Sequence, residues 1–174
     1  MTEEQQRIRG YLVAQGAKLT PAAIVEKVQA AMADLRAAAV TVPPARFAER
    51  PEPAEWSANE VMAHVLAADG YFGGGICRLL RGQPPAGRPE GRGVEQASHR
   101  TAEAWCGLLV TQREELFAAV RAADPAAAPD QRIDHPMFGP LTWRETLLFT
   151  RLHDLDHAGQ LQKIAAAFAA PRPA

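Results

Sequence analysis

Two histidines near the C-terminal end of the chain have a spacing that suits metal coordination. In the segment "FTRLHDLDHAGQ", His157 follows four residues after His153. Residues four apart on a helix project from the same face, so both imidazoles can meet one cation. The HExxH motif of zinc proteases has this spacing, but Asp154 stands where that motif has its general-base glutamate. The pair alone leaves two interpretations open, a metal site or two polar residues on one helix.

A third histidine, His64, is the strongest candidate to complete such a site. Its helical neighbours, including Val61, Ala67 and Tyr71, are mostly apolar, which is also typical of a core histidine whose ring is hydrogen-bonded. Three imidazoles that converge in a helical core leave coordination positions open, as catalytic zinc sites do. A carboxylate-bridged two-metal site is not indicated, because it needs repeated Glu-x-x-His motifs that this chain lacks.

The remaining histidines and the cysteines carry weaker signals. His99 lies in the polar segment "EQASHR" and is expected in solvent, and His135 precedes a proline in a predicted loop. Cys77 and Cys106 are far apart and form no CxxC motif, so neither a zinc knuckle nor a disulfide framework is predicted. No GxSxG or Cys/His pattern supplies a protein nucleophile.

Four long helices are predicted to position these residues. Their apolar residues recur at intervals of three and four, and capping residues mark several of their starts. The first starts at Thr20 with Pro21 as its first helical residue, and the Ser57–Glu60 pair forms a capping box at the second. The expected ranges are 20–39, 57–80, 94–122 and 142–169. The glycine triplet at 73–75 predicts a kink or a loosened turn in the second helix, and residues 3–15 predict a short leading helix.

The fold class follows from these helices and from the segments that join them. The connections at 40–56, 81–93 and 123–141 are rich in Pro and Gly, and no segment predicts a sheet. Long helices joined in this way are typical of an all-α four-helix bundle with long crossover connections. We expect a single domain over 1–174, with 1–19 as an N-terminal extension.

Composition narrows the class of protein. The 174 residues include 19 basic and 20 acidic side chains, a formal net charge of −1, which argues against nucleic-acid binding. No apolar run approaches the roughly 20 residues of a membrane span, and the charged N-terminus lacks the apolar core of a signal peptide. A soluble, cytoplasmic protein without a membrane partner is the expectation.

Two blocks of the sequence resemble the DinB/YfiT-like superfamily. The segment "EWSANEVMAHVLAADGYF" is similar to that family's W-S-x-x-E-x-x-x-H motif. The segment "HPMFGPLTWRETLLFTRLHDLDHAGQLQKI" is similar to its F-G-x-L-T motif followed by H-x-x-x-H-x-x-Q. The matching positions are Trp56, Ser57, Glu60, His64, Phe138, Gly139, Leu141, Thr142, His153, His157 and Gln160.

The resemblance implies a four-helix bundle with a crossover, often as a homodimer, and one divalent metal ion, commonly zinc or nickel. The ligands would be His64, His153 and His157. Family members of known chemistry use small thiols, and others are described as metal-dependent hydrolases. We therefore expect a metal-bound low-molecular-weight thiol or water to act on a small-molecule substrate by S-transfer or hydrolysis. A non-catalytic metal-binding stress-response bundle and a purely structural bundle remain the alternatives.

Two departures from the family pattern leave the acid/base chemistry unassigned. Asp154 stands where glutamate is frequent, and Ala158 stands where arginine or histidine is frequent. Arginines between 81 and 92 could bind an anionic thiol, but a solvated loop is the favoured interpretation.

Overall fold

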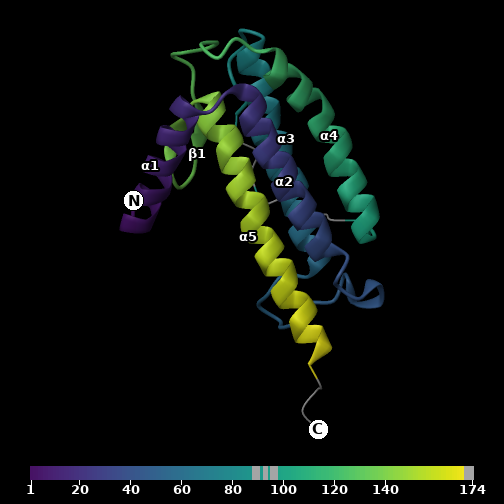
Figure 1. Ribbon diagram of the computed structural model, residues 1–174. Coiled ribbons are helices and arrows are strands. Elements are labelled where there is room, and N and C mark those ends of the chain that lie inside the picture. The colour runs from purple at the N-terminus through teal and green to yellow at the C-terminus, as the bar shows by residue number, and fades with distance from the viewer. Residues whose placement is uncertain (88–90, 92–93, 95–97, 171–174) are drawn as a thin grey trace.

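Nearly all regular structure in the chain is helical (Figure 1). The computed structural model describes residues 1–87, 91, 94 and 98–170. In chain order the elements are α1 (Glu3–Lys18), α2 (Pro21–Ala39), the short 3-10 helix η1 (Pro44–Arg46), α3 (Ala58–Leu80), α4 (Ala102–Ala122), β1 (Ile133–His135), β2 (Gly139–Leu141) and α5 (Trp143–Ala169). The expected all-α class is confirmed in the coarse sense of a mainly helical fold.

Reciprocal caps fix the starts of the two helices that carry the candidate site. At α3, the Ser57 hydroxyl accepts the Glu60 backbone N–H at 3.2 Å, and the Glu60 carboxylate accepts the Ser57 N–H at 2.8 Å. Thr142 and Glu145 make the same exchange at the start of α5. These capping boxes satisfy amides that have no partner within the helix. Both helix starts therefore agree with the sequence prediction to within a residue.

The four longest helices pack side by side around a shared interior. α2 and α3 each pack against both α4 and α5. Hydrogen bonds join Asn59 to Trp105 and Asp69 to Arg113, so partners advance in the same direction along α3 and α4. These two helices are therefore parallel, so the connection between α3 and α4 is a crossover. The sequence permitted this crossover without requiring it.

The N-terminal segment is part of the packed structure. α1 spans 16 residues, longer than the expected helix at 3–15, and it packs on α5. Leu12 is fully buried in the core. The Arg144 guanidinium donates to the backbone oxygen of Gly16 at 2.7 Å and to that of Leu19, which joins the end of α1 to the start of α5.

The glycine triplet does not interrupt its helix, and one helix begins later than predicted. α3 continues as an α-helix through its glycine triplet. Close packing accounts for two of the three glycines. A Cβ atom at Gly73 would lie 3.1 Å from Leu116, and one at Gly75 would lie 3.2 Å from Ile133. The helix expected from residue 94 begins at Ala102, with Thr101 as its N-cap. Residues 95–97 of that expected range lie outside the described residues.

The expectation of no sheet was also wrong, because a short hairpin interrupts the connection at 123–141. β1 and β2 pair antiparallel, with Ile133 opposite Leu141 and His135 opposite Gly139. His135 Nδ1 accepts the backbone N–H groups of Met137 and Phe138, both at 3.2 Å, which closes the turn. Three-residue strands are too short for an alternating pattern to reveal them.

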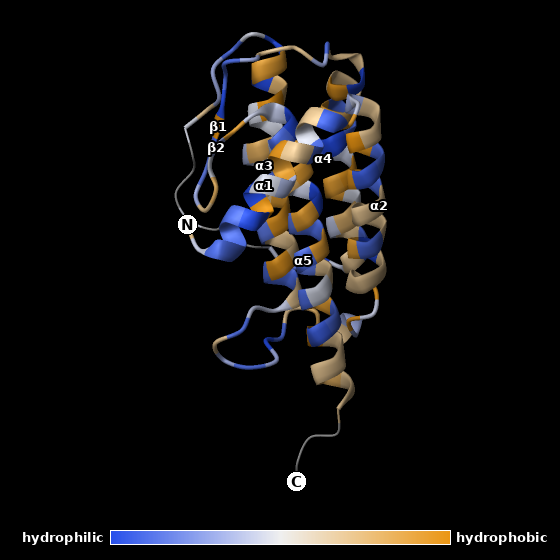
Figure 2. Cartoon of the chain, turned by 60° about the vertical axis from the view of Figure 1, so that its left-hand side comes forward, coloured by the Kyte–Doolittle hydropathy of each residue, from blue (hydrophilic) through white to orange (hydrophobic). Residues whose placement is uncertain are grey.

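Hydrophobic and hydrophilic residues alternate along the helices (Figure 2). The buried apolar residues form two clusters, and polar side chains lie between them. One cluster contains the early part of α5, including Leu147 and Phe149, and the other contains Ala158 and Leu161 further along that helix. We call the intervening residues the central polar layer. It consists of His64, Asp69, Arg113, Thr150, His153, Asp154 and His157, with the exposed Gln112 at its edge.

Candidate metal centre

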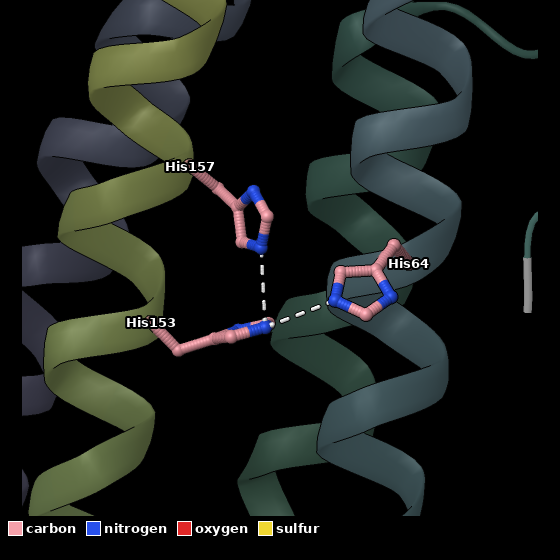
Figure 3. Close-up of side chains that lie close together, drawn as sticks. All are labelled: His64, His153 and His157. Carbon is pink, nitrogen blue, oxygen red and sulfur yellow. Dashed lines mark hydrogen bonds between the residues drawn. The ribbon is translucent and has the colours of Figure 1, made fainter. Parts of the chain in front are cut away.

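The central polar layer brings together the three histidines that the sequence singled out. His64 comes from α3, and His153 and His157 come from α5 (Figure 3). His153 Nε2 lies 3.2 Å from His64 Nε2 and 3.1 Å from His157 Nε2. One nitrogen from each ring lies within 4.8 Å of the other two. Across the described part of the chain, this is the only group of three or more His, Cys, Asp or Glu side chains that could hold a metal ion.

Neighbouring side chains hold the three rings in place. His157 Nδ1 lies 2.9 Å from Gln160 Oε1, and since an amide oxygen only accepts, Nδ1 must carry the proton. His157 Nε2 then has a free lone pair directed at the cluster. The ring of Trp56 packs 5.1 Å from that of His64, and the ring of Phe149 packs 5.5 Å from that of His153. The hydrogen bond to Gln160 is typical of metal-binding histidines, whose second ring nitrogen donates to a neighbouring acceptor that orients the ring.

Burial keeps two of the rings neutral. The pKa of His153 lies well below its ordinary value, first because the ring is buried and then because His157, His64, Arg113 and His135 would repel a proton. Burial also lowers the pKa of His157, against a smaller opposing effect of the Gln160 hydrogen bond. Neutral imidazole is the form that binds metal.

The donor set fits one divalent cation. Metal–nitrogen bonds of 2.0–2.1 Å in tetrahedral geometry place neighbouring nitrogens about 3.3 Å apart. Two of the three separations, 3.1 and 3.2 Å, are close to that value, and the third, between His64 and His157, is no more than 4.8 Å. Three neutral nitrogen donors from two helices would leave a position for water or a substrate.

The metal-free protein should lose stability as the pH falls below about 6.5, the ordinary pKa of histidine in an unfolded chain. His153 and His157 have lowered pKa values when folded, so below that pH the unfolded chain binds protons that the folded chain does not. Urea denaturation between pH 7 and 5 measures the effect. The double variant His153→Gln/His157→Gln should show a flatter dependence, and identical slopes would contradict this prediction.

The other histidines lie elsewhere, as expected for residues outside the cluster. His99 is exposed. His135 is buried, which the sequence did not suggest, with its ring stacked on Phe138 at 4.6 Å and packed edge-on against Phe149 at 4.2 Å. Its Nδ1 already accepts two backbone N–H groups of the hairpin turn.

The carboxylates of Asp154 and Glu60 are engaged with other partners than the histidines. Asp154 is fully buried and both of its carboxylate oxygens accept from Arg113. Glu60 caps the start of α3, as the capping motif predicted. Its carboxylate also forms an ion pair with Arg50.

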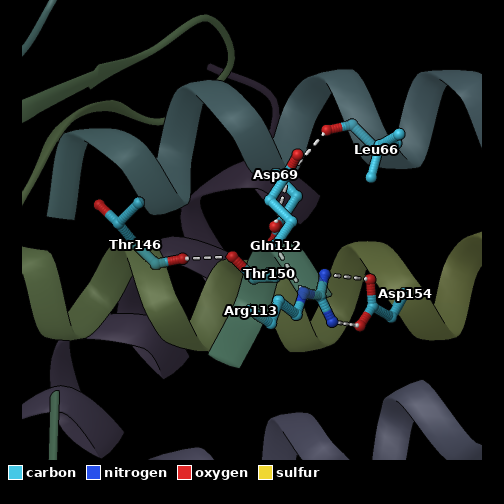
Figure 4. A network of polar contacts seen from close by, with 7 residues as sticks. All are labelled: Leu66, Asp69, Gln112, Arg113, Thr146, Thr150 and Asp154. Carbon is cyan, nitrogen blue, oxygen red and sulfur yellow. Dashed lines mark hydrogen bonds and ion pairs between the residues drawn. The ribbon is translucent and has the colours of Figure 1, made fainter. Parts of the chain in front are cut away.

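Sequence reasoning missed the ionic part of the central polar layer. Arg113 of α4 bridges Asp69 of α3 and Asp154 of α5, and all three side chains are buried (Figure 4). A signal was present, because Arg113 stands at helical spacing between the buried Leu109 and Leu116. A charge at an apolar position of a helix indicates a buried partner.

A cavity lies beside the histidines. It has a volume of 460 Å³ and is lined by Ala54, Glu55, Trp56, Gln160, Lys163 and Ile164. Trp56 and Gln160 each contact a histidine of the cluster, so the cavity wall and the candidate metal centre share side chains. The volume is within the range of small-molecule sites.

Comparison with protein families identifies the chain. The family model of the DinB superfamily matches residues 27–161, which include all three histidines and Arg113. The chain belongs to the DinB superfamily. Comparisons with curated proteins and with solved structures give no match. For this DinB superfamily member, no helix among the described residues is long and apolar enough to cross a membrane.

Proposed function

We propose that this protein is a metal-dependent enzyme that activates a small thiol or a water molecule for S-transfer or hydrolysis. The observation that carries the proposal is the convergence of three histidine Nε2 atoms, two of them 3.1 and 3.2 Å from the third. A divalent cation, zinc or nickel, bound there would lower the pKa of a bound water or deprotonate a bound thiol.

The chain's own residues would supply binding and orientation. His64, His153 and His157 hold the cation, and Gln160 fixes the ring of His157 through Nδ1. The cavity between residues 54–56 and α5 would receive the substrate, with Trp56 as an apolar wall and Lys163 as an exposed cation. The lining also contains the exposed carboxylate of Glu55, so its charges select neither sign, and its size favours a small molecule.

Neither cysteine is suited to act as the nucleophile, so replacing both should leave turnover intact. Burial raises the pKa values of Cys77 and Cys106, which disfavours the reactive thiolate. The double variant Cys77→Ser/Cys106→Ser should therefore convert electrophiles in a thiol-conjugation screen at the wild-type rate. Loss of turnover in a variant that still binds metal would indicate a cysteine mechanism and refute this part of the proposal.

We also propose that the protein forms a homodimer. Exposed apolar residues remain on α4, where Leu108 is 38% and Val110 is 47% accessible. Light scattering at micromolar concentration should give twice the chain mass. A monomer mass under these conditions would exclude the dimer without affecting the metal site.

Elemental analysis and a conjugation screen test the proposal in sequence. Protein purified without a metal-affinity tag should contain a divalent metal, and the metal-loaded protein should conjugate small thiols to electrophiles or hydrolyse esters. A metal-loaded protein without any turnover or thiol binding would favour the non-catalytic metal-binding alternative.

A further inference from the structure

Arg113 is held by buried partners on two other helices. Its Nε donates to Asp69 Oδ1 at 2.7 Å, and its Nη1 and Nη2 donate to the two carboxylate oxygens of Asp154 at 2.5 and 3.0 Å (Figure 4). The relative exposure of all three side chains is 3% or less. Asp69 Oδ2 additionally accepts from Gln112 at 2.9 Å. The guanidinium thus has a fixed orientation with respect to α3 and α5.

The two carboxylates stand on the same helices as the histidines, one directly beside His153 and the other within about one and a half turns of His64. Asp154 directly follows His153 on α5. Asp69 follows His64 by five residues on α3, a rise of roughly 7.5 Å at 1.5 Å per residue. A change in the distance or register between α3 and α5 at this level would move His64 relative to His153 and His157.

Stability alone does not account for this ionic bridge. Buried ion pairs and triads lose hydration, and well-packed apolar side chains in their place are often equally or more stabilising. A fixed, directional bridge does have value where donor atoms from different helices must meet within about 0.5 Å. The planar guanidinium provides that geometry through bidentate hydrogen bonds, which the single ammonium group of lysine cannot reproduce.

We propose that Arg113 is a positioning residue: by bridging Asp69 and Asp154 it sets the separation and register of α3 and α5 at which the three histidine nitrogens converge. Arg113 touches neither the cation nor the substrate. The inference deepens the proposed function and rests on it, because the value of this convergence lies in metal binding.

The decisive variant replaces the whole bridge by apolar side chains, Asp69→Leu/Arg113→Met/Asp154→Leu. It leaves no unpaired buried charge, so the metal-free variant should melt at or above the wild-type temperature. Its zinc affinity should nevertheless fall by about 10-fold or more, the size of effect that supporting residues have at metal sites. The visible absorption spectrum of its cobalt(II) form should change in shape and intensity, because the ligand geometry is altered.

Two further variants separate positioning from stability. Arg113→Lys keeps the positive charge and should also weaken zinc binding. Leu12→Ala creates a cavity in the core away from the bridge, so it should lower the melting temperature but leave the zinc affinity and the cobalt spectrum as in wild type. Wild-type affinity and an unchanged cobalt spectrum in the folded triple variant would overturn the proposal.

Crystal structures of the metal-free wild-type protein and triple variant make the test independent of metal binding. The separations of 3.1 and 3.2 Å between histidine nitrogens should widen in the triple variant. If the wild-type protein binds no metal, the proposed function fails, and these structures still decide whether Arg113 positions the histidines. Unchanged separations would refute the positioning role itself.

Discussion

Zinc at one hundred times its dissociation constant is expected to raise the free energy of unfolding of the metal-free protein by about 2.7 kcal/mol. The three donors come from two helices, so they meet only when α3 and α5 are packed together. The unfolded chain therefore binds the metal far less well. For a domain of this size the gain corresponds to a rise of about 5–10 °C in the melting temperature.

Thermal denaturation with and without a chelator measures this gain. His64→Ala and His153→Ala should each abolish most of the shift, whereas His99→Ala, at an exposed position outside the cluster, should retain it. A full shift in His64→Ala together with its loss in His153→Ala would contradict the three-ligand site. His64 would then be a core residue only.

Arg113→Met is expected to lower the free energy of unfolding by about 3–5 kcal/mol, the largest loss that we predict for a single substitution. The change leaves Asp69 and Asp154 buried without their shared cation. Each carboxylate would remain desolvated and would lose its charge-assisted hydrogen bonds. Urea denaturation at pH 7 measures the loss.

Two controls identify the cause of that loss. Desolvation raises the pKa of a buried carboxyl group, and it already raises that of Asp154 despite the opposing guanidinium. A folded carboxyl group with a raised pKa binds protons more readily than the unfolded chain, so Arg113→Met should recover part of its stability relative to wild type between pH 7 and 5. Arg121→Met, at an exposed position of α4, should cost little. A loss below about 1 kcal/mol for Arg113→Met would mean that the carboxylates find other partners.

Local signals predicted the helices well. The starts of α2, α3 and α5 followed from Thr20, Ser57 and Thr142, because capping is a contact between residues three apart in sequence. The start of α4 was placed too early, because Thr101 has no partner glutamine or glutamate three residues later to complete a capping box. The glycine triplet does not interrupt α3, and close contacts with Leu116 and Ile133, both distant in sequence, account for two of its glycines.

The site could be predicted only in part. The spacing of His153 and His157 places both side chains on the same face of α5. Whether His64 approaches them depends on how α3 packs against α5. Its helical position made His64 a candidate but equally fitted a core histidine, and the family resemblance favoured the ligand. The ionic bridge could not be predicted, because Asp69, Arg113 and Asp154 lie about 40 residues apart and no local pattern relates them. The buried ring of His135 has the same explanation, since its aromatic partners include Phe72 and Phe149.

The most direct test of the three-histidine metal centre is elemental analysis of the protein and its variants purified without a metal-affinity tag. We predict one divalent metal ion per chain in the wild-type protein and in His99→Ala. Folded His64→Ala, His153→Ala and His157→Ala should each contain far less. Wild-type protein that holds no metal after dialysis against zinc or nickel, or a His64→Ala variant that still holds one ion per chain, would contradict the account.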